Sequence, residues 1–584
     1  MTPSDPAGDP PKYPAALRWA LLVVLPYIVL AFIWAITNPA DAAPDEHDHL
    51  IKALGAAQLD IGVQYTGPPF EDSLAATRNA SITRTVTIPF HLYPAGYDCL
   101  AFHPDRTADC LPTSGPPGDG TTSANTTVGA YPVFGYIPIG MLAQLAQTPN
   151  QAFVLGRFAS ILMSSAFLLV AAWQLVRWLG RGALLGLAVA VTPMVVFVAA
   201  SVSTSGLEIT TAIAVGSVAV VATRRPESLA DRGTLAVLSV SAVCLLLSRQ
   251  LGVASLALAA VVALSRGGAP VVWRQIRAGR PAIFVTIGVV AFAALTIFWW
   301  ERSFDNPAIT DSITSSFFSA TNFGDFADRG LDIIRSAIGW FGWVDTPLPG
   351  AVMALWIVLT VSVIGAAAII GSRADAITLV LGFLYVCLVG YVVQGTVFAP
   401  IQGAIQGRHL LPTFSLIPIL AGVVLHEKVS GEALAGGRRR LFGFVGVVVG
   451  AVQLFSLLIN ARRYAVGVDG PAVFLSAAQW APCGGWLPWL LIALVAALWL
   501  IVVIYRSGLP GPLPSVAIGA GVVGAGVIDA AGGGQSAVVE GSPPDDQPKP
   551  GDRLMTDGET AGVRDTDAGD IDKQGEQESV IGQR

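Results

Sequence analysis

Apolar runs long enough to cross a lipid bilayer recur along most of this 584-residue chain. A spanning helix needs about 20 consecutive, mostly apolar residues, because the hydrocarbon core offers the backbone no hydrogen-bond partners. About twelve runs approach this length. They cover residues 17–36, 153–178, 183–201, 207–223, 235–247, 252–264, 282–300, 352–370, 377–393, 410–425, 441–459 and 487–505. Together with a hydrophobic content of 53%, they predict an all-α polytopic membrane protein with about 12 transmembrane helices.

Changes in composition divide the chain into three segments. Residues 1–14 are polar and Pro-rich and are predicted to be a disordered tail before a membrane domain over residues 15–506. Residues 507–584 are rich in Gly, Pro and Asp and become acidic, which predicts a second disordered tail. A GxGxxG pattern at residues 519–524 follows no predicted strand, so a dinucleotide site is not expected. The chain also lacks a basic stripe with interleaved aromatic residues, so nucleic-acid binding is not expected.

The placement of Arg and Lys predicts the orientation of the membrane domain. With the N-terminus in the cytoplasm, the short inner loops carry more Arg and Lys than the short outer loops, as the positive-inside rule requires. Both tails are then cytoplasmic, and two long loops, at about 38–130 and 301–350, lie outside the cell. Cys99 and Cys110 lie close together in the first of these loops, so a disulfide between them is compatible with an oxidising compartment.

The most strongly charged stretch of the first outer loop, residues 43–49, directly follows the first apolar run. It contains three carboxylates and two imidazoles. If Pro44 opens a helix, Asp45 and Glu46 lie at the positive end of the helix dipole and on the same side as His49. Such a cluster suits a general base, a metal ion or a cationic or hydroxyl-rich ligand. Glu46 and His49 would supply two ligands to a divalent metal, whose further ligands the sequence does not identify. A cap for an interfacial helix is the simpler alternative.

Further candidate residues lie where the chain returns to the membrane from the outer loops. The candidate substrate-binding residues are His49, Tyr131, Arg157, Trp343, Asp345, Gln406, Arg408 and His409. An outward carboxylate and an outward arginine together suit transfer of a group from a lipid phosphate. In this interpretation Asp45 is the base, Glu46 positions it or binds a metal, and Arg408 holds the phosphate. Simpler alternatives are that the arginines bind lipid headgroups and that the tryptophans anchor the membrane interface.

The order of several motifs resembles a bacterial membrane-protein family known as domain of unknown function 2142. These motifs are Pro44-Asp45-Glu46 with His49, Thr192-Pro193-Met194, Gly342-Trp343-x-Asp345-Thr346-x-x-Pro349 and Gln406-Gly407-Arg408-x-Leu410-Leu411-Pro412. The resemblance covers about residues 15–505. That family is similar in architecture to the GT-C glycosyltransferases, which are integral membrane enzymes that use polyprenyl-phosphate sugars.

This resemblance implies a GT-C-like fold and a catalytic role for Asp45 and Glu46, because an acidic residue or pair in the first outer loop is catalytic in GT-C enzymes. It implies an inverting transferase in a bacterial plasma membrane that moves a sugar from a polyprenyl-phosphate donor to an envelope glycan or lipid acceptor. Apart from a divalent metal, no cofactor is implied. His409 replaces an expected tyrosine, and Pro132 is single where a Pro-Pro pair is common.

Two other functions stay open at this point. One is a transporter or flippase for a lipid-linked or polar substrate, which should show an internal repeat or charges at mid-bilayer. No clear repeat is visible, and the charges gather at the ends of the apolar runs. The other is a non-catalytic membrane protein that organises assembly of the cell envelope.

Overall fold

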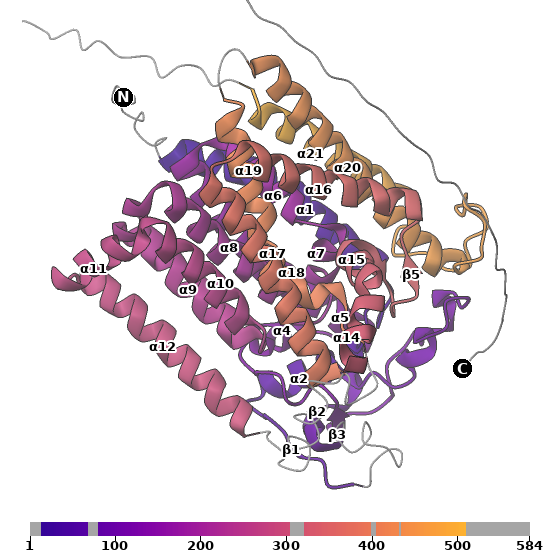
Figure 1. Ribbon diagram of the computed structural model, residues 1–584. Coiled ribbons are helices and arrows are strands. Elements are labelled where there is room, and N and C mark those ends of the chain that lie inside the picture. Colours follow the sequence, from indigo (N-terminus) through magenta and orange to yellow (C-terminus); the bar gives the residue numbers. More distant parts are fainter. Residues whose placement is uncertain (1–12, 68–79, 304–319, 399–403, 431–433, 510–584) are drawn as a thin grey trace, which may run out of the picture. The chain divides into compact units, whose positions relative to one another are not determined.

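Apolar helices form most of the computed structural model, which describes residues 13–67, 80–303, 320–398, 404–430 and 434–509 (Figure 1). Nearly all of the two predicted tails lies outside these residues. Within them, nine helical segments are long and apolar enough to span a membrane. They are α1 (Tyr13–Thr37), α5 (Pro149–Leu179), α8 (Ser205–Arg224), α10 (Gly252–Ala263) continuing through α11 (Ala269–Arg277), α12 (Pro281–Arg302), α16 (Gly350–Ile370), α17 (Arg373–Val393), α20 (Ala435–Val466) and α21 (Trp486–Ser507).

Two bent helix pairs and one shorter helix account for the remaining apolar runs. The helices α6 (Leu184–Ala190) and α7 (Pro193–Ala199) meet at 77°, and α18 (Gly407–Phe414) and α19 (Leu416–Lys428) meet at 44°. The shorter apolar helix is α9 (Arg232–Ser248). Each predicted run therefore coincides with a helix or a bent pair, and the all-α polytopic fold is confirmed.

The break between α6 and α7 lies where the sequence predicted one continuous span. Pro193 disfavours helical geometry at the preceding Thr192, whose backbone is extended. The Thr192 hydroxyl donates to the carbonyl of Ala337, 2.8 Å away, and so joins the break to the second outer segment. The bend lets α7 pack beneath that segment instead of crossing straight past it.

The predicted first outer loop, between α1 and α5, is folded around α2 (Glu46–Ala57). A three-stranded antiparallel sheet, β1 (Val63–Gln64), β2 (Arg84–Pro89) and β3 (Thr121–Thr126), packs on one side of α2, and α4 (Tyr136–Ala143) packs on another. A Cβ atom on Gly140 would come within 1.8 Å of the Ala53 carbonyl oxygen, so α4 can approach α2 this closely only with glycine. Leu54 and Ile139 are buried in this contact. The position of α2 is thus fixed by packing along its length.

The second outer segment contains α14 (Ala320–Asp328), α15 (Gly330–Gly339) and a small hairpin of β4 (Trp340–Phe341) and β5 (Thr346–Pro347). Phe341 packs against Trp34 of α1 and Phe197 of α7, with ring centroids 4.9 and 5.4 Å apart. This buried aromatic contact holds the hairpin over the end of α1. The hairpin turn carries Trp343 and Asp345.

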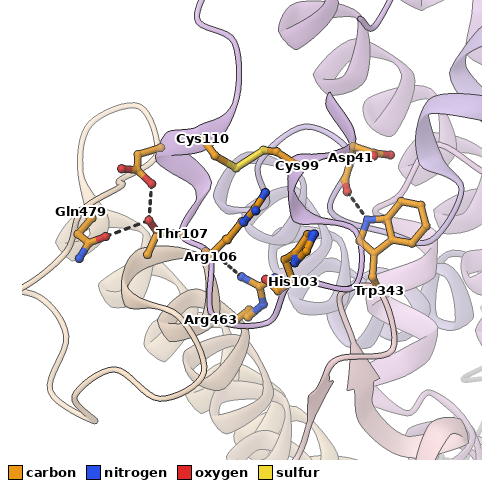
Figure 2. The surroundings of a disulfide bond; sticks show 10 residues. Asp41, Cys99, His103, Arg106, Thr107, Cys110, Trp343, Arg463 and Gln479 are labelled. Carbon is orange, nitrogen blue, oxygen red and sulfur yellow. Dashed lines mark hydrogen bonds between the residues drawn. A yellow bond between two sulfur atoms is a disulfide. The ribbon is translucent and has the colours of Figure 1, made fainter. Parts of the chain in front are cut away.

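A disulfide joins Cys99 and Cys110, as their spacing allowed (Figure 2). The loop that it closes lies against the outer end of α20. Arg463 of α20 donates to the backbone carbonyls of His103, 2.8 Å away, and Arg106. Thr107 donates to the side chain of Gln479 at 3.0 Å. Figure 2 shows these contacts on the side of the loop that faces α20 and the following segment.

Candidate active site

The acidic cluster begins α2 in a different way from the one predicted. Pro44 does not open the helix, because α2 begins at Glu46 and Asp45 is the N-cap. The backbone of Asp45 is left-handed, with φ of 61°, a conformation that Asp tolerates better than most residues. Within the described chain, no hydrogen bond or ion pair engages its exposed side chain. The carboxylate of Asp45 is therefore free to act on another molecule.

The neighbouring carboxylate, Glu46, is buried in an ion pair with Arg157 of α5. The Arg157 Nε and Nη2 atoms donate to the two Glu46 oxygens at 2.8 and 2.6 Å. The Glu46 carboxylate also accepts the backbone N–H of Val202 at 2.8 Å. The remaining N–H groups of Arg157 donate to the carbonyls of Ala35, Asn38 and Pro39. All five N–H groups of this guanidinium are thus used inside the protein.

This geometry bears on three predicted roles. Arg157 has no N–H left for a substrate, and both side chains of the pair are at most 1% exposed. Both oxygens of Glu46 are occupied by hydrogen bonds, and Nδ1 of His49 is hydrogen-bonded to the Tyr136 hydroxyl. In the described part of the chain, no group of three or more His, Cys, Asp or Glu residues is placed to hold a metal ion. The Glu46–Arg157 pair instead ties α2 to α1, α5 and the segment before α8.

Two arginines that form no ion pair in the described structure lie within electrostatic reach of the free Asp45. Arg249 follows the last residue of α9, and Arg408 lies in the first turn of α18. Their charges interact with the charge of Asp45 and with each other. Among the described residues neither forms an ion pair, and the Nε atom of each is buried without a hydrogen-bond partner. Because a buried N–H group normally has a hydrogen-bond partner, this arrangement is suited to an anion from outside the protein.

Tyr131 and His49 line the same site. The guanidinium of Arg249 lies 4.3 Å from the ring centroid of Tyr131. His49 stacks against Tyr131 and Tyr136, with ring centroids 6.0 and 5.7 Å away, and its Nδ1 lies 2.7 Å from the Tyr136 hydroxyl. Burial, together with the positive charges of Arg249 and Arg408, keeps the pKa of His49 well below its usual range. His49 is therefore a neutral imidazole at physiological pH.

His47 has the opposite charge state. Its Nδ1 lies 3.1 Å from both oxygens of the buried Asp41, and Trp343 donates to the Asp41 carbonyl at 2.9 Å while stacking on the imidazole. Burial alone would lower the pKa of His47, but the hydrogen bond with Asp41 and the nearby carboxylates raise it to about 9. A cation thus lies beside Asp45 in sequence. Trp343 stacks on this imidazole and also binds the backbone of Asp41, which the sequence did not predict.

The remaining predicted residues stand near the rim of the site. Asp345 pairs with Arg463 of α20 at 3.0 Å, so it fastens the hairpin to α20. Gln406 precedes α18, and its backbone N–H donates to Nδ1 of His409 at 3.3 Å. His409 stacks on Phe398 with ring centroids 5.2 Å apart. These contacts shape the start of α18, from which Arg408 extends.

Sequence reasoning missed two residues of this site, Glu208 and the role of Arg249. Glu208 lies in the first turn of α8, is 3% exposed, and has an oxygen without a hydrogen-bond partner in the described structure. Its charge interacts with that of Arg249. The sequence contained a recognisable signal for each of these two residues. Glu208 is a lone acidic residue in an apolar run, and Arg249 opposes the positive-inside bias of the outer loops.

A family model described as "Predicted membrane protein (DUF2142)" matches residues 28–420. The chain belongs to this family. The resemblance drawn from the motif order is thereby confirmed, and the match includes Asp45, Arg249 and Arg408 of the candidate site. No match is found among curated proteins.

Among solved structures, the chain is similar to ArnT from Cupriavidus metallidurans in the apo state. The two are 15% identical, and the similarity covers 85% of this chain and 78% of the ArnT chain, with a TM-score of 0.37. A TM-score this low does not support transfer of a residue role or a substrate.

Proposed function

We propose that this membrane protein transfers a sugar from a polyprenyl-phosphate donor to an acceptor hydroxyl at the outer face of the membrane. The observation that carries the proposal is the free carboxylate of Asp45 within electrostatic reach of two arginines, Arg249 and Arg408, that form no ion pair among the described residues. A phosphate monoester or diester is the anion that such a pair of guanidinium groups binds best. The sequence resemblance to GT-C enzymes supports a donor of this chemical class.

In the proposed reaction, Arg249 and Arg408 bind the phosphate of the donor. Asp45 accepts the proton of the acceptor hydroxyl as its oxygen attacks the anomeric carbon of the sugar. The bond from that carbon to the phosphate oxygen breaks, so the configuration is inverted and polyprenyl phosphate leaves. The two arginines stabilise the charge that develops on this leaving group. The neutral His49 and Tyr131 are placed to hydrogen-bond or stack against the sugar.

The disulfide supports the proposed side of the membrane. Cys99 and Cys110 are bonded in the same outer loop that carries α2, and such bonds persist in oxidising compartments. This supports an extracytoplasmic position for Asp45, in agreement with the distribution of Arg and Lys. Because nucleotide sugars are held in the cytoplasm, an outer site needs a donor carried by a lipid.

Complementation of a deletion strain tests the proposal. Asp45→Asn, Arg249→Ala and Arg408→Ala should each abolish the formation of one envelope glycan while their membrane levels stay at the wild-type value. Loss of a general base lowers the rate by roughly 10²–10⁴-fold. Asp98→Asn, which changes another exposed carboxylate of the same loop, is the matched control and should complement fully. If all four variants restore the glycan, the transferase assignment is wrong.

A transporter or flippase is distinguished by the same strains. In that case the modified lipid or polar substrate should accumulate on the inner side with its sugar still attached. The transferase instead predicts accumulation of an intact lipid-linked donor on the outer side. The ionisable groups of the site gather at helix ends, at the start of α2, α8 and α18 and the end of α9, which favours the transferase.

A further inference from the structure

A second cationic site lies at the other end of α1 from Asp45. A pocket of about 660 Å³ opens between the start of α1, the turn η4 (Arg181–Ala183) and the end of α21. From Arg18 to Thr37, α1 rises about 29 Å, which is close to the thickness of the hydrocarbon core. The pocket and the candidate active site are therefore on opposite sides of the membrane.

Three arginines from three different elements line this pocket. They are Arg18 of α1, Arg181 of η4 and Arg506 of α21, and no acidic residue of the described chain lines the pocket. Arg18 and Arg506 are exposed and form no ion pair within the described chain. Arg181 uses one N–H on the carbonyl of Leu509, 2.8 Å away. The charge of Arg438 also acts on Arg181, so the local field is strongly positive.

The other lining side chains are of the types that are common at the boundary between lipid and water. Trp19 and Trp499 line the pocket, and the Arg181 guanidinium lies 4.9 Å from the Trp19 ring centroid. Tryptophan is enriched at the level of lipid headgroups. Leu22, Val502 and Val503 continue the pocket along α1 and α21 toward the middle of the membrane. The pocket thus has a cationic mouth and an apolar floor.

We propose that this pocket binds an anionic phospholipid, with the phosphate at the three arginines and an acyl chain along Leu22 and Val502. Basic pockets between transmembrane helices on the cytoplasmic side bind anionic headgroups in this way. The bound lipid would fill the junction of α1 and α21, which lie side by side (Figure 1). This site is separate from the proposed transfer reaction and stands whether or not that reaction is correct.

Native mass spectrometry of the full-length protein, released from nanodiscs of equimolar phosphatidylcholine and phosphatidylglycerol, tests the site. Wild-type protein should retain phosphatidylglycerol over phosphatidylcholine. The double variant Arg18→Gln/Arg506→Gln should retain at least about tenfold less, because each arginine near an anionic headgroup contributes roughly a fivefold factor. The control Arg232→Gln/Arg373→Gln removes two exposed arginines that lie outside the pocket and should behave as wild type. Equal retention by the two double variants overturns the proposal.

A third variant separates a lipid from a free phosphate. Val502→Trp fills the apolar floor, since Val502 is 46% exposed there, and leaves every charge in place. It should also lose phosphatidylglycerol. Inorganic phosphate added at millimolar concentration should leave the lipid bound to the wild-type protein. Displacement of the lipid by phosphate alone, or wild-type retention by Val502→Trp, would contradict a lipid-specific pocket.

Discussion

Asp45 and Glu46 are adjacent in sequence, yet their carboxylates belong to opposite kinds of site. Glu46 is buried against Arg157, and every polar atom of that pair has a partner. Asp45 is exposed and unpaired, and its charge interacts with those of Arg249 and Arg408, which form no ion pair in the described structure. Two adjacent residues thus differ in kind: Glu46 belongs to a closed site, in which every hydrogen bond is made inside the protein, and Asp45 belongs to an open site, whose charged groups form no ion pair among the described residues.

The difference shows how to separate stability from function in a charged cluster. An ion pair whose hydrogen bonds are all made inside the protein has nothing left to offer a ligand, but removing one partner leaves a buried charge. Charges that are close but unpaired cost stability and are retained where a ligand completes them. The Glu46–Arg157 pair should therefore govern folding, and the Asp45–Arg249–Arg408 group should govern activity.

The largest effect on stability is expected from breaking the closed pair. Glu46→Gln or Arg157→Ala should lower the free energy of unfolding by about 3–5 kcal/mol, because each strands its partner's charge in the interior. The thermal midpoint of the purified protein and its level in membranes measure this effect. Asp45→Asn, one residue away, should leave both unchanged.

An exposed pair provides the matched control for this prediction. Asp332 and Arg335 form an ion pair in α15 with side chains 52% and 46% exposed. Arg335→Ala should change stability by less than about 1 kcal/mol, because surface pairs contribute little. If Glu46→Gln instead keeps wild-type stability and loses the envelope glycan, Glu46 belongs to the open site. Glu46 and Asp45 would then not differ in role.

Removal of the disulfide should give the next largest loss of stability. The disulfide loop contacts the residues that hold the hairpin carrying Trp343. Cys99→Ser with Cys110→Ser should cost about 2–4 kcal/mol, the usual contribution of a native bridge. The loop holds Arg463, which in turn holds Asp345 and the hairpin that carries Trp343. Thermal midpoints with and without a thiol reductant measure the loss. A reductant that lowers the midpoint of wild type but not of the double variant confirms that the bridge is the cause.

The sequence predicts those features of the structure that depend on residues close together in the chain. Helices follow from apolar runs, since a membrane leaves the backbone few alternatives, and each predicted run became a helix or a bent pair. The Asp45–His49 cluster was equally visible as a dense group of charges in an apolar chain. These features are local, and composition alone reveals them.

The assignment of partners could not be predicted, because it depends on long-range packing. Arg157 lies 111 positions from Glu46, and Arg463 lies 118 positions from Asp345. The sequence does not indicate that the N–H groups of Arg157 would all be hydrogen-bonded inside the protein while Arg408 would keep an Nε without a partner in the described structure. The left-handed backbone of Asp45, which turns its side chain away from α2, is also set by the surrounding fold. Only Glu208 and Arg249 carried a local signal that was overlooked.

A smaller effect, of opposite sign, is expected in the open site. Arg408→Ala should leave the free energy of unfolding unchanged or raise it by about 1 kcal/mol, because it removes a desolvated charge that forms no ion pair in the described chain and lies near the like charge of Arg249. Differential scanning fluorimetry of the purified proteins measures this change. Arg463→Ala, which removes an arginine that forms an ion pair, is the control and should be clearly destabilising. A large loss of stability in Arg408→Ala would mean that this arginine has a structural partner.

The smallest effect is a pH dependence that comes from His47, beside the open carboxylate. Its pKa is raised from 6.5 to about 9 in the folded protein by Asp41 and the neighbouring carboxylates. A raised pKa stabilises the fold fully below pH 6.5, and this stabilisation is lost as the pH rises from 6.5 to 9. The difference in thermal midpoint between wild type and His47→Gln should therefore be largest below pH 6.5 and should vanish above pH 9. A difference that stays constant, or that grows with pH, would show that His47 is neutral, and Asp45 would then have no fixed cation beside it.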